Sequence, residues 1–136
     1  MPSEPWLAPS REQRAVDALD AISAIAEFIA ATDKNAFTND RKTRSAVERE
    51  LLTISEACTK IRELEIDSNL PQSERLEARF PKIPWQQIRG LGSVLRHEYG
   101  RVDAEIIWNT IAGSDLAELR NALIKAIPRP KRKPSK

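Results

Sequence analysis

One short stretch of the chain gathers the side chains best suited to acid–base chemistry. Residues 93–103 read SVLRHEYGRVD, and they hold the only histidine, His97, and the only tyrosine, Tyr99. An imidazole ordinarily titrates near neutral pH, which makes His97 the natural candidate for a general base or acid. If the protein is an enzyme that moves protons, we therefore expect its reaction to centre on this stretch.

Helical geometry sorts the polar groups of this stretch. Ser93 and His97 are four residues apart and share one face of a helix. Arg89 lies within roughly 80° of His97 about the helix axis, so its long guanidinium could reach the same pocket. Tyr99 points nearly the other way unless the helix ends before Gly100. A structural role for His97 stays open, because a protonated histidine near a helix C-terminus interacts favourably with the helix dipole.

Two glycines stand in the middle of the same helix. Gly90 and Gly92 each cost about 1 kcal/mol of helix stability relative to alanine. Such a cost predicts that another backbone approaches closely, in tight helix packing or across a dimer axis. Insertion of a polar ligand is the less favoured explanation.

The remaining residues exclude several familiar kinds of site. A single histidine and a single cysteine, Cys58, cannot assemble a zinc site without a cluster of carboxylates, and no cluster is spaced for one. The sequence GLG at 90–92 lies inside a helix and does not follow a strand, so it is no nucleotide-binding loop. No nucleophile elbow is present. We expect Cys58 to be a buried small hydrophobic residue.

The charge of the chain is divided unevenly. Lysine and arginine total 22 against 20 acidic residues, but five of the basic residues fall in residues 128–136, which hold no acid. The rest of the chain is therefore slightly acidic, and any RNA contact would have to be local, through a groove or this tail. No stretch approaches the roughly 20 apolar residues needed to span a bilayer. A lone cysteine fits a reducing compartment, so we expect a cytoplasmic protein without a membrane segment.

Apolar residues recur at intervals of three and four, which is typical of amphipathic helices, and no strand pattern stands out. The first helix is expected from Ser10, with Gln13 at the capping-box spacing, to about Thr32. The second helix is expected to begin at one of three competing caps, Thr38, Asn39 or Asp40, and to end near Glu65. A short third helix is expected before Pro81, and a fourth from Pro84 to Gly100. A short helical segment is expected after Asp103, and a last helix from Ser114 to Pro128. The predicted buried stripes are Val16, Leu19, Ile22, Ala26 and Ile29; Val47, Leu51, Ile54, Cys58 and Ile61; and Leu116, Leu119, Leu123 and Ile127. This pattern predicts an all-α, up-and-down bundle of four or five helices over residues 10–127, after an N-terminal extension (1–9) and before a disordered basic tail (128–136).

Two blocks of the sequence resemble one protein family. PWQQIRGLGSVLRHEYGRVDAEIIW at 84–108 resembles the signature region of the HepT-like toxins, which belong to the all-α HEPN ribonuclease superfamily. TRSAVERELLTISEAC at 43–58 resembles the preceding conserved block of that family. The resemblance covers roughly residues 13–127. It implies a homodimeric HEPN-type bundle that is a metal-independent endoribonuclease, the toxin of a toxin–antitoxin pair with a minimal nucleotidyltransferase as antitoxin.

The resemblance also implies roles for individual residues. His97 matches the motif histidine, the general base or acid for attack of an RNA 2′-hydroxyl on its own phosphate. The motif arginine, which stabilises the phosphorane charge, does not carry over, because Gly92 stands five residues before His97. Arg96 or Arg89 could supply that charge from a shifted backbone position, and Arg96 of the opposing subunit could supply it across the cleft between the two copies. Tyr99 matches the tyrosine to which the nucleotidyltransferase would transfer AMP from ATP, and no other cofactor and no metal is implied.

Two further residues are predicted to support the site. Ser93 stands where a polar neighbour of the motif arginine usually follows, and Glu56 is expected to hold Arg89 or Arg96 in place. A second interpretation stays open beside the nuclease. In it, the same bundle has lost catalysis along with the motif arginine and serves as a binding module for the nucleotidyltransferase or for a nucleotide.

Overall fold

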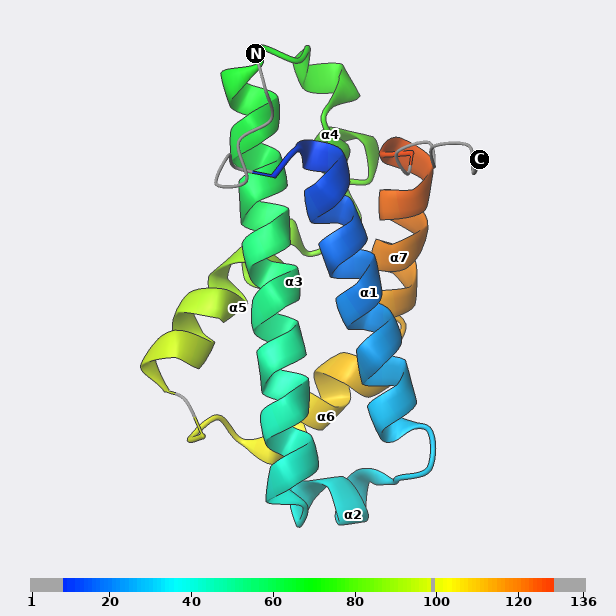
Figure 1. Ribbon diagram of the computed structural model, residues 1–136, viewed down its shortest axis with the longest axis vertical. Coiled ribbons are helices and arrows are strands. Elements are labelled where there is room, and N and C mark those ends of the chain that lie inside the picture. Colours follow the sequence, from blue (N-terminus) through cyan, green and yellow to red (C-terminus); the bar gives the residue numbers. More distant parts are fainter. Residues whose placement is uncertain (1–8, 99, 129–136) are drawn as a thin grey trace, which may run out of the picture.

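The computed structural model describes residues 9–98 and 100–128, and it contains helices and no strand within these ranges (Figure 1). The all-α fold class predicted from the apolar periodicity is confirmed. In chain order the elements are α1 (Arg11–Ile29), α2 (Lys34–Thr38), α3 (Arg41–Asp67), the 3₁₀ helix η1 (Gln72–Glu74), α4 (Leu76–Arg79), α5 (Trp85–His97), α6 (Ala104–Ala112) and α7 (Asp115–Ala126). The predicted extension and basic tail lie almost wholly outside the described residues. No helix in the described part of the chain is long and apolar enough to cross a membrane.

The long helix α3 forms the centre of the fold. α1 runs antiparallel along one side of it with α7 beside α1, and α5 packs against the other side of α3 (Figure 1). All five residues of the apolar stripe predicted for α3 are buried, with exposed fractions of 3% or less. The last helix buries its predicted stripe as well, although Leu116 is only partly covered. The core is therefore built where these two periodic patterns placed it.

α1 begins as predicted and buries Leu19 and Ile22 of the predicted stripe, but Val16 and Ile29 are only partly covered. The Ser10 hydroxyl accepts the backbone N–H of Gln13 at 3.1 Å, as an N-cap should. The Gln13 side chain donates to Asp17 instead, so the reciprocal half of the capping box does not form. The helix ends at Ile29, before the predicted end. Its buried residues are Ala15, Ala18, Leu19, Ala21, Ile22 and Ile25, whereas Ala26 is exposed. Alanines on this face let α3 approach closely. A stripe defined mainly by large apolar residues does not include them.

A short helix that the sequence analysis did not predict connects α1 to α3. α2 is capped by Asp33, whose carboxylate accepts the N–H of Ala36 at 2.8 Å, and it buries Phe37 completely. Of the three caps considered for the next helix, Asp40 is the one that acts. The hydroxyl and the backbone N–H of Thr43 donate to its carboxylate, and these bonds lower the pKa of Asp40.

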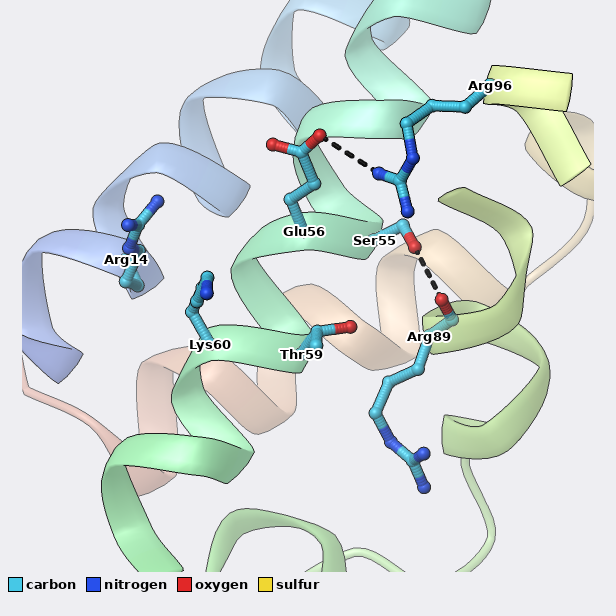
Figure 2. A pocket seen from close by; sticks show the side chains of 7 residues that line it. All are labelled: Arg14, Ser55, Glu56, Thr59, Lys60, Arg89 and Arg96. Carbon is cyan, nitrogen blue, oxygen red and sulfur yellow. Dashed lines mark hydrogen bonds and ion pairs between the residues drawn. The ribbon is translucent and has the colours of Figure 1, made fainter. Parts of the chain in front are cut away.

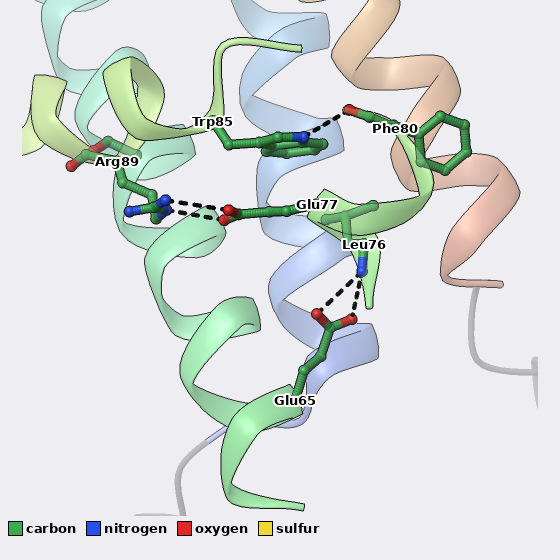
Figure 3. A network of polar contacts seen from close by, with 7 residues as sticks. Glu65, Leu76, Glu77, Phe80, Trp85 and Arg89 are labelled. Carbon is green, nitrogen blue, oxygen red and sulfur yellow. Dashed lines mark hydrogen bonds and ion pairs between the residues drawn. The ribbon is translucent and has the colours of Figure 1, made fainter. Parts of the chain in front are cut away.

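The short helix predicted before Pro81 is divided in two. Arg75 adopts an extended backbone conformation (φ −74°, ψ 147°) and separates η1 from α4. The carboxylate of Glu65, which is 2% exposed, accepts the N–H of Leu76 and so satisfies the start of α4 (Figure 3). Arg11 pairs with the same carboxylate at 2.9 Å, which compensates its buried charge.

Three further helix ends depart from the prediction. Pro84 is the N-cap of α5 and not its first helical residue, and the helix ends at His97, before Gly100. Ser114 precedes α7 without a side-chain hydrogen bond, so it is no side-chain cap. Ile127 is extended, as expected for a residue that precedes proline, and the helix stops there.

Candidate active site

His97 is the last residue of α5, and its side chain is exposed. It shares the outer face of the helix with Gly90, Ser93 and Val94, which are exposed as well. The opposite face carries the buried residues of α5, which are Trp85, Gly92 and Leu95. The imidazole is therefore open to a macromolecular substrate, and Ser93 lies one turn away on the same face, where helical spacing placed it.

The side chain of Arg96 turns towards α3. Its Nη1 donates to Oε1 of Glu56 across 3.2 Å (Figure 2). Both side chains remain about half exposed, at 54% and 50%. Because an exposed ion pair contributes little to stability, an anionic ligand could compete with Glu56 for this guanidinium. Of the two arginines that Glu56 was expected to hold, Arg96 is the one it contacts.

Arg89 is engaged elsewhere. Its Nε and Nη2 donate to the two carboxylate oxygens of Glu77 at 2.9 and 3.1 Å, in the paired geometry typical of arginine and carboxylate (Figure 3). Both side chains are about three-quarters covered. This pairing joins α5 to α4 and occupies the guanidinium that could have served beside His97.

Gly92 marks the closest approach of α5 to α3. The buried hydroxyl of Ser55 accepts the N–H of Gly92 at 2.8 Å and donates to the carbonyl of Arg89 at 2.9 Å. A Cβ at position 92 would lie 2.7 Å from Oγ of Ser55, so a larger residue would push the helices apart. A neighbour approaches Gly92 closely, as predicted, but it is the Ser55 side chain and not another backbone. At Gly90 no described atom lies within 4 Å of an added Cβ, so within one copy of the chain the same explanation is wrong for that position.

The space beside Gly92 holds the Arg96 guanidinium. A Cβ built on Gly92 would lie 3.5 Å from Nη1 of Arg96. The end of the Arg96 side chain thus lies beside the point where a side chain at position 92 would begin. A positive charge is therefore present next to this position although the residue itself carries none.

A pocket of about 320 Å³ opens beside this arginine, across the surface of α3 between α1 and α5 (Figure 2). Seven residues line it: Arg14, Ser55, Glu56, Thr59, Lys60, Arg89 and Arg96. Four of them are basic and only Glu56 is acidic, although the chain body as a whole is slightly acidic. This local excess of positive charge fits an anionic ligand. Nowhere in residues 9–98 and 100–128 do three or more histidine, cysteine, aspartate or glutamate side chains gather as metal ligands.

The segment after α5 is fastened to α3. Tyr99, the predicted modification site, lies outside the described residues. Gly100 follows with φ +76°, a left-handed conformation that glycine adopts without strain. Its N–H donates to Oε1 of Glu48 at 3.4 Å, a carboxylate that is 5% exposed. This contact holds the chain near the end of α5.

Comparison with known proteins identifies the family of the chain. The family model described as ribonuclease HepT-like matches residues 18–126. The chain belongs to the HepT-like ribonuclease family. Among curated proteins, "Probable ribonuclease HepT" of Thermococcus cleftensis is 32% identical over 109 residues, covering 80% of this chain and 88% of that protein. "Putative RNase MJ1380" of Methanocaldococcus jannaschii is 30% identical over 95 residues, covering 70% and 77%. No solved structure matches the chain.

Membership of the HepT-like family confirms the resemblance found in the sequence, and the matched segment contains both quoted blocks. Sequence reasoning nevertheless missed part of the pocket. Arg14 on α1 and Lys60 on α3 line it, and so does Thr59. The only signal for them is that Glu56, Thr59 and Lys60 recur at helical spacing on one polar face. Nothing in the sequence shows that Arg14 of another helix lies opposite.

Proposed function

We propose that this HepT-like chain is the toxin of a toxin–antitoxin pair and cuts RNA without a metal ion, with His97 as general base or acid. Its family and the names of its relatives support a ribonuclease. The accessible imidazole at the end of α5 supports His97 as the group that moves the proton.

The observation that carries this proposal is the position of Arg96. The family motif has arginine where this chain has Gly92, and the Arg96 guanidinium lies beside that position. We infer that Arg96 supplies the missing charge from a backbone position four residues later. The glycine leaves the space, and Glu56 orients the guanidinium until a phosphate takes its place.

The proposed chemistry needs only these groups. His97 takes the proton of an RNA 2′-hydroxyl, and the 2′-oxygen attacks the adjacent phosphorus. Arg96 stabilises the extra negative charge of the phosphorane, because a guanidinium donates two parallel hydrogen bonds to phosphate oxygens. The bond to the 5′-oxygen then breaks, and this oxygen leaves as it accepts a proton from the protonated His97, which restores the neutral imidazole. One fragment ends in a 2′,3′-cyclic phosphate.

We further propose that two copies of the chain pair through the outer face of α5. Val94 is 47% exposed there, and Gly90 presents bare backbone with nothing against it. A partner helix packed on this face would bury both and would explain why a helix interior keeps a glycine without a neighbour. The pairing would set the two His97 side chains in one cleft.

The antitoxin in this proposal is a nucleotidyltransferase that transfers AMP from ATP to Tyr99. Support comes from the position of this residue in the family motif, two residues after His97. Incubation with the cognate enzyme and ATP should add the mass of AMP to the wild type and not to Tyr99→Phe. Modification that persists in Tyr99→Phe would place the acceptor elsewhere.

The deciding experiment for the nuclease is RNA cleavage in EDTA. We expect the wild type to cut, His97→Ala to lose about 100- to 10,000-fold in rate, and Arg96→Ala to lose about 100- to 1,000-fold. Arg120→Ala, on an exposed turn of α7, is the control and should cut like the wild type. Full activity of His97→Ala would overturn the assignment.

A second candidate function is a binding module without catalysis. The observation that favours it is that Ser55 leaves no room at position 92 for the motif arginine. In that case, wild-type protein shown by mass to carry no AMP would cut no RNA, yet would still bind the nucleotidyltransferase. Cleavage that depends on His97 excludes this candidate.

A further inference from the structure

The pocket beside Arg96 is also lined by two basic residues, Arg14 and Lys60, that have no role in the proposed cleavage. Figure 2 shows Arg14 and Lys60 at one side of the α3 surface and Arg96 at the other, with Glu56 and Thr59 between them. Arg14 comes from α1, and the other four residues come from α3 and α5. The pocket thus extends from the proposed catalytic arginine to a second basic edge.

The two edges differ in how their charges are neutralised. Arg96 is paired with Glu56, and Arg89 with Glu77. Lys60 forms an ion pair with Glu63 at 3.3 Å on its own helix, where both side chains are about half exposed, and with no other residue in the described part of the chain. Such an exposed pair within one helix contributes little.

The charge of Arg14 is not neutralised by an ion pair within residues 9–98 and 100–128. Its Nε is buried and has no hydrogen-bond partner among these residues, so the guanidinium is poorly satisfied by the protein itself. Because Arg14 lines the pocket, an anion there would be attracted by this charge. Thr59, also in the lining, carries a hydroxyl that can donate to the same anion.

From these contacts we propose that Arg14 and Lys60 form a binding subsite for a backbone phosphate of the RNA, next to the phosphate that Arg96 holds for cleavage. The inference rests on the proposed function in that the ligand is the RNA strand. The subsite makes no contact with the reacting atoms. It positions the strand, adds affinity through charge, and carries no base specificity.

The test measures binding and cleavage separately. Binding uses a 2′-O-methyl RNA oligonucleotide, which cannot be cleaved, followed by fluorescence anisotropy over a series of salt concentrations. The variants are Arg14→Gln, Lys60→Gln and the double variant. Arg62→Gln is the control on α3 and Arg120→Gln the control on α7, since both remove one exposed charge outside this pocket. Circular dichroism checks that all the variants are folded.

We expect Arg14→Gln and Lys60→Gln each to weaken binding by up to about tenfold and to lower the slope of log Kd against log salt by about one, while the controls do neither. With cleavable RNA, KM should rise in the same variants and kcat should stay at the wild-type value, because the subsite holds the strand and not the transition state.

Three results would overturn the subsite. The variants could bind RNA like the controls, the controls could weaken binding equally, or the wild-type protein could fail to bind RNA. Wild-type protein that binds the oligonucleotide through Arg14 and Lys60 but does not cut cleavable RNA would disprove the nuclease and leave the subsite standing.

Discussion

At the scale of single residues, the structure separates the two arginines that the sequence could not tell apart. Both lie on α5, Arg96 directly before His97 and Arg89 eight residues before it, so from the sequence either could act beside His97. Arg89 is about three-quarters covered and pairs with Glu77, whereas Arg96 is half exposed and pairs with Glu56. A covered pair between elements contributes to stability, and an exposed pair leaves its charge available to a ligand. The two residues should therefore respond to mutation in opposite ways.

Substitution should reveal this difference directly. Arg89→Ala leaves the Glu77 carboxylate without its partner and should lower the free energy of unfolding by about 1–3 kcal/mol, with kcat of the folded fraction unchanged. Arg96→Ala should change stability by less than about 1 kcal/mol and remove most of the cleavage. Urea unfolding and RNA cleavage, measured on the same preparations, test both halves. Loss of kcat in folded Arg89→Ala would return Arg89 to the site.

Cys58 gives a second residue-scale prediction. It lies in the buried stripe of α3, and burial raises the pKa of its thiol to about 12, from an ordinary value of 9.0. The thiolate, which is the reactive form, is therefore scarce at pH 8 in the native state. A thiol reagent such as dithionitrobenzoate should not react with native protein at that pH and should react with one thiol after denaturation in guanidinium. Rapid reaction under native conditions would contradict the burial.

At the scale of the elements, periodicity predicted the helices that bury long apolar stripes and missed those held by polar contacts. α3 and α7 satisfy the pattern of large residues at three and four, so their core positions followed from the sequence. α2 is too short to show a period, and its start depends on Asp33. The break between η1 and α4 follows from Glu65, whose carboxylate bonds to Leu76, eleven residues away. Tertiary contacts of this kind cannot be found in one segment alone.

The residues of the candidate site likewise divide into those that the sequence made visible and those that only the packing of the helices brings together. The motif around His97 was visible because its residue types are rare in this chain. The pocket residue Arg14 is one of many basic residues in the sequence, and only the packing of α1 against α3 sets it apart. The close packing at Gly92 was predictable, since a glycine within a helix indicates that a neighbour comes near. The sequence did not show that this neighbour is Ser55.

The contact at Gly92 leads to a prediction about helix packing. Gly92→Ala places a methyl group 2.7 Å from the Ser55 hydroxyl and should destabilise the fold by about 1–3 kcal/mol. Gly90→Ala adds the same methyl group to the same helix with no atom within 4 Å, so it should leave stability unchanged or raise it by up to about 1 kcal/mol. Chemical denaturation compares the two variants. Sedimentation of each separates a change in pairing from a change in folding, and equal destabilisation would contradict the contact.

At the scale of the whole molecule, the helices bury apolar residues between them, and five large ones are exposed among residues 9–98 and 100–128. These are Phe28, Ile66, Val94, Ile106 and Ile124. Val94 is the one that shares a helix face with His97 and Gly90. A face that combines an exposed valine, bare glycine backbone and an accessible imidazole is best explained if a second copy covers part of it. Assembly and activity would then depend on the same surface.

A charged residue on this outer face of α5 should therefore abolish both dimer formation and RNA cleavage. We expect Val94→Glu to convert the proposed dimer to a monomer and to reduce RNA cleavage at least as strongly as it reduces dimerisation, because a buried unpaired carboxylate opposes pairing. Ile124→Glu is the matched control, since Ile124 is exposed to nearly the same extent, 46% against 47%, but lies on α7. It should leave both properties at the wild-type level. Sedimentation equilibrium and cleavage assays on the two variants decide the matter. If Val94→Glu remains a dimer with full activity, the copies pair through another face; if it becomes an active monomer, the site is complete within one chain.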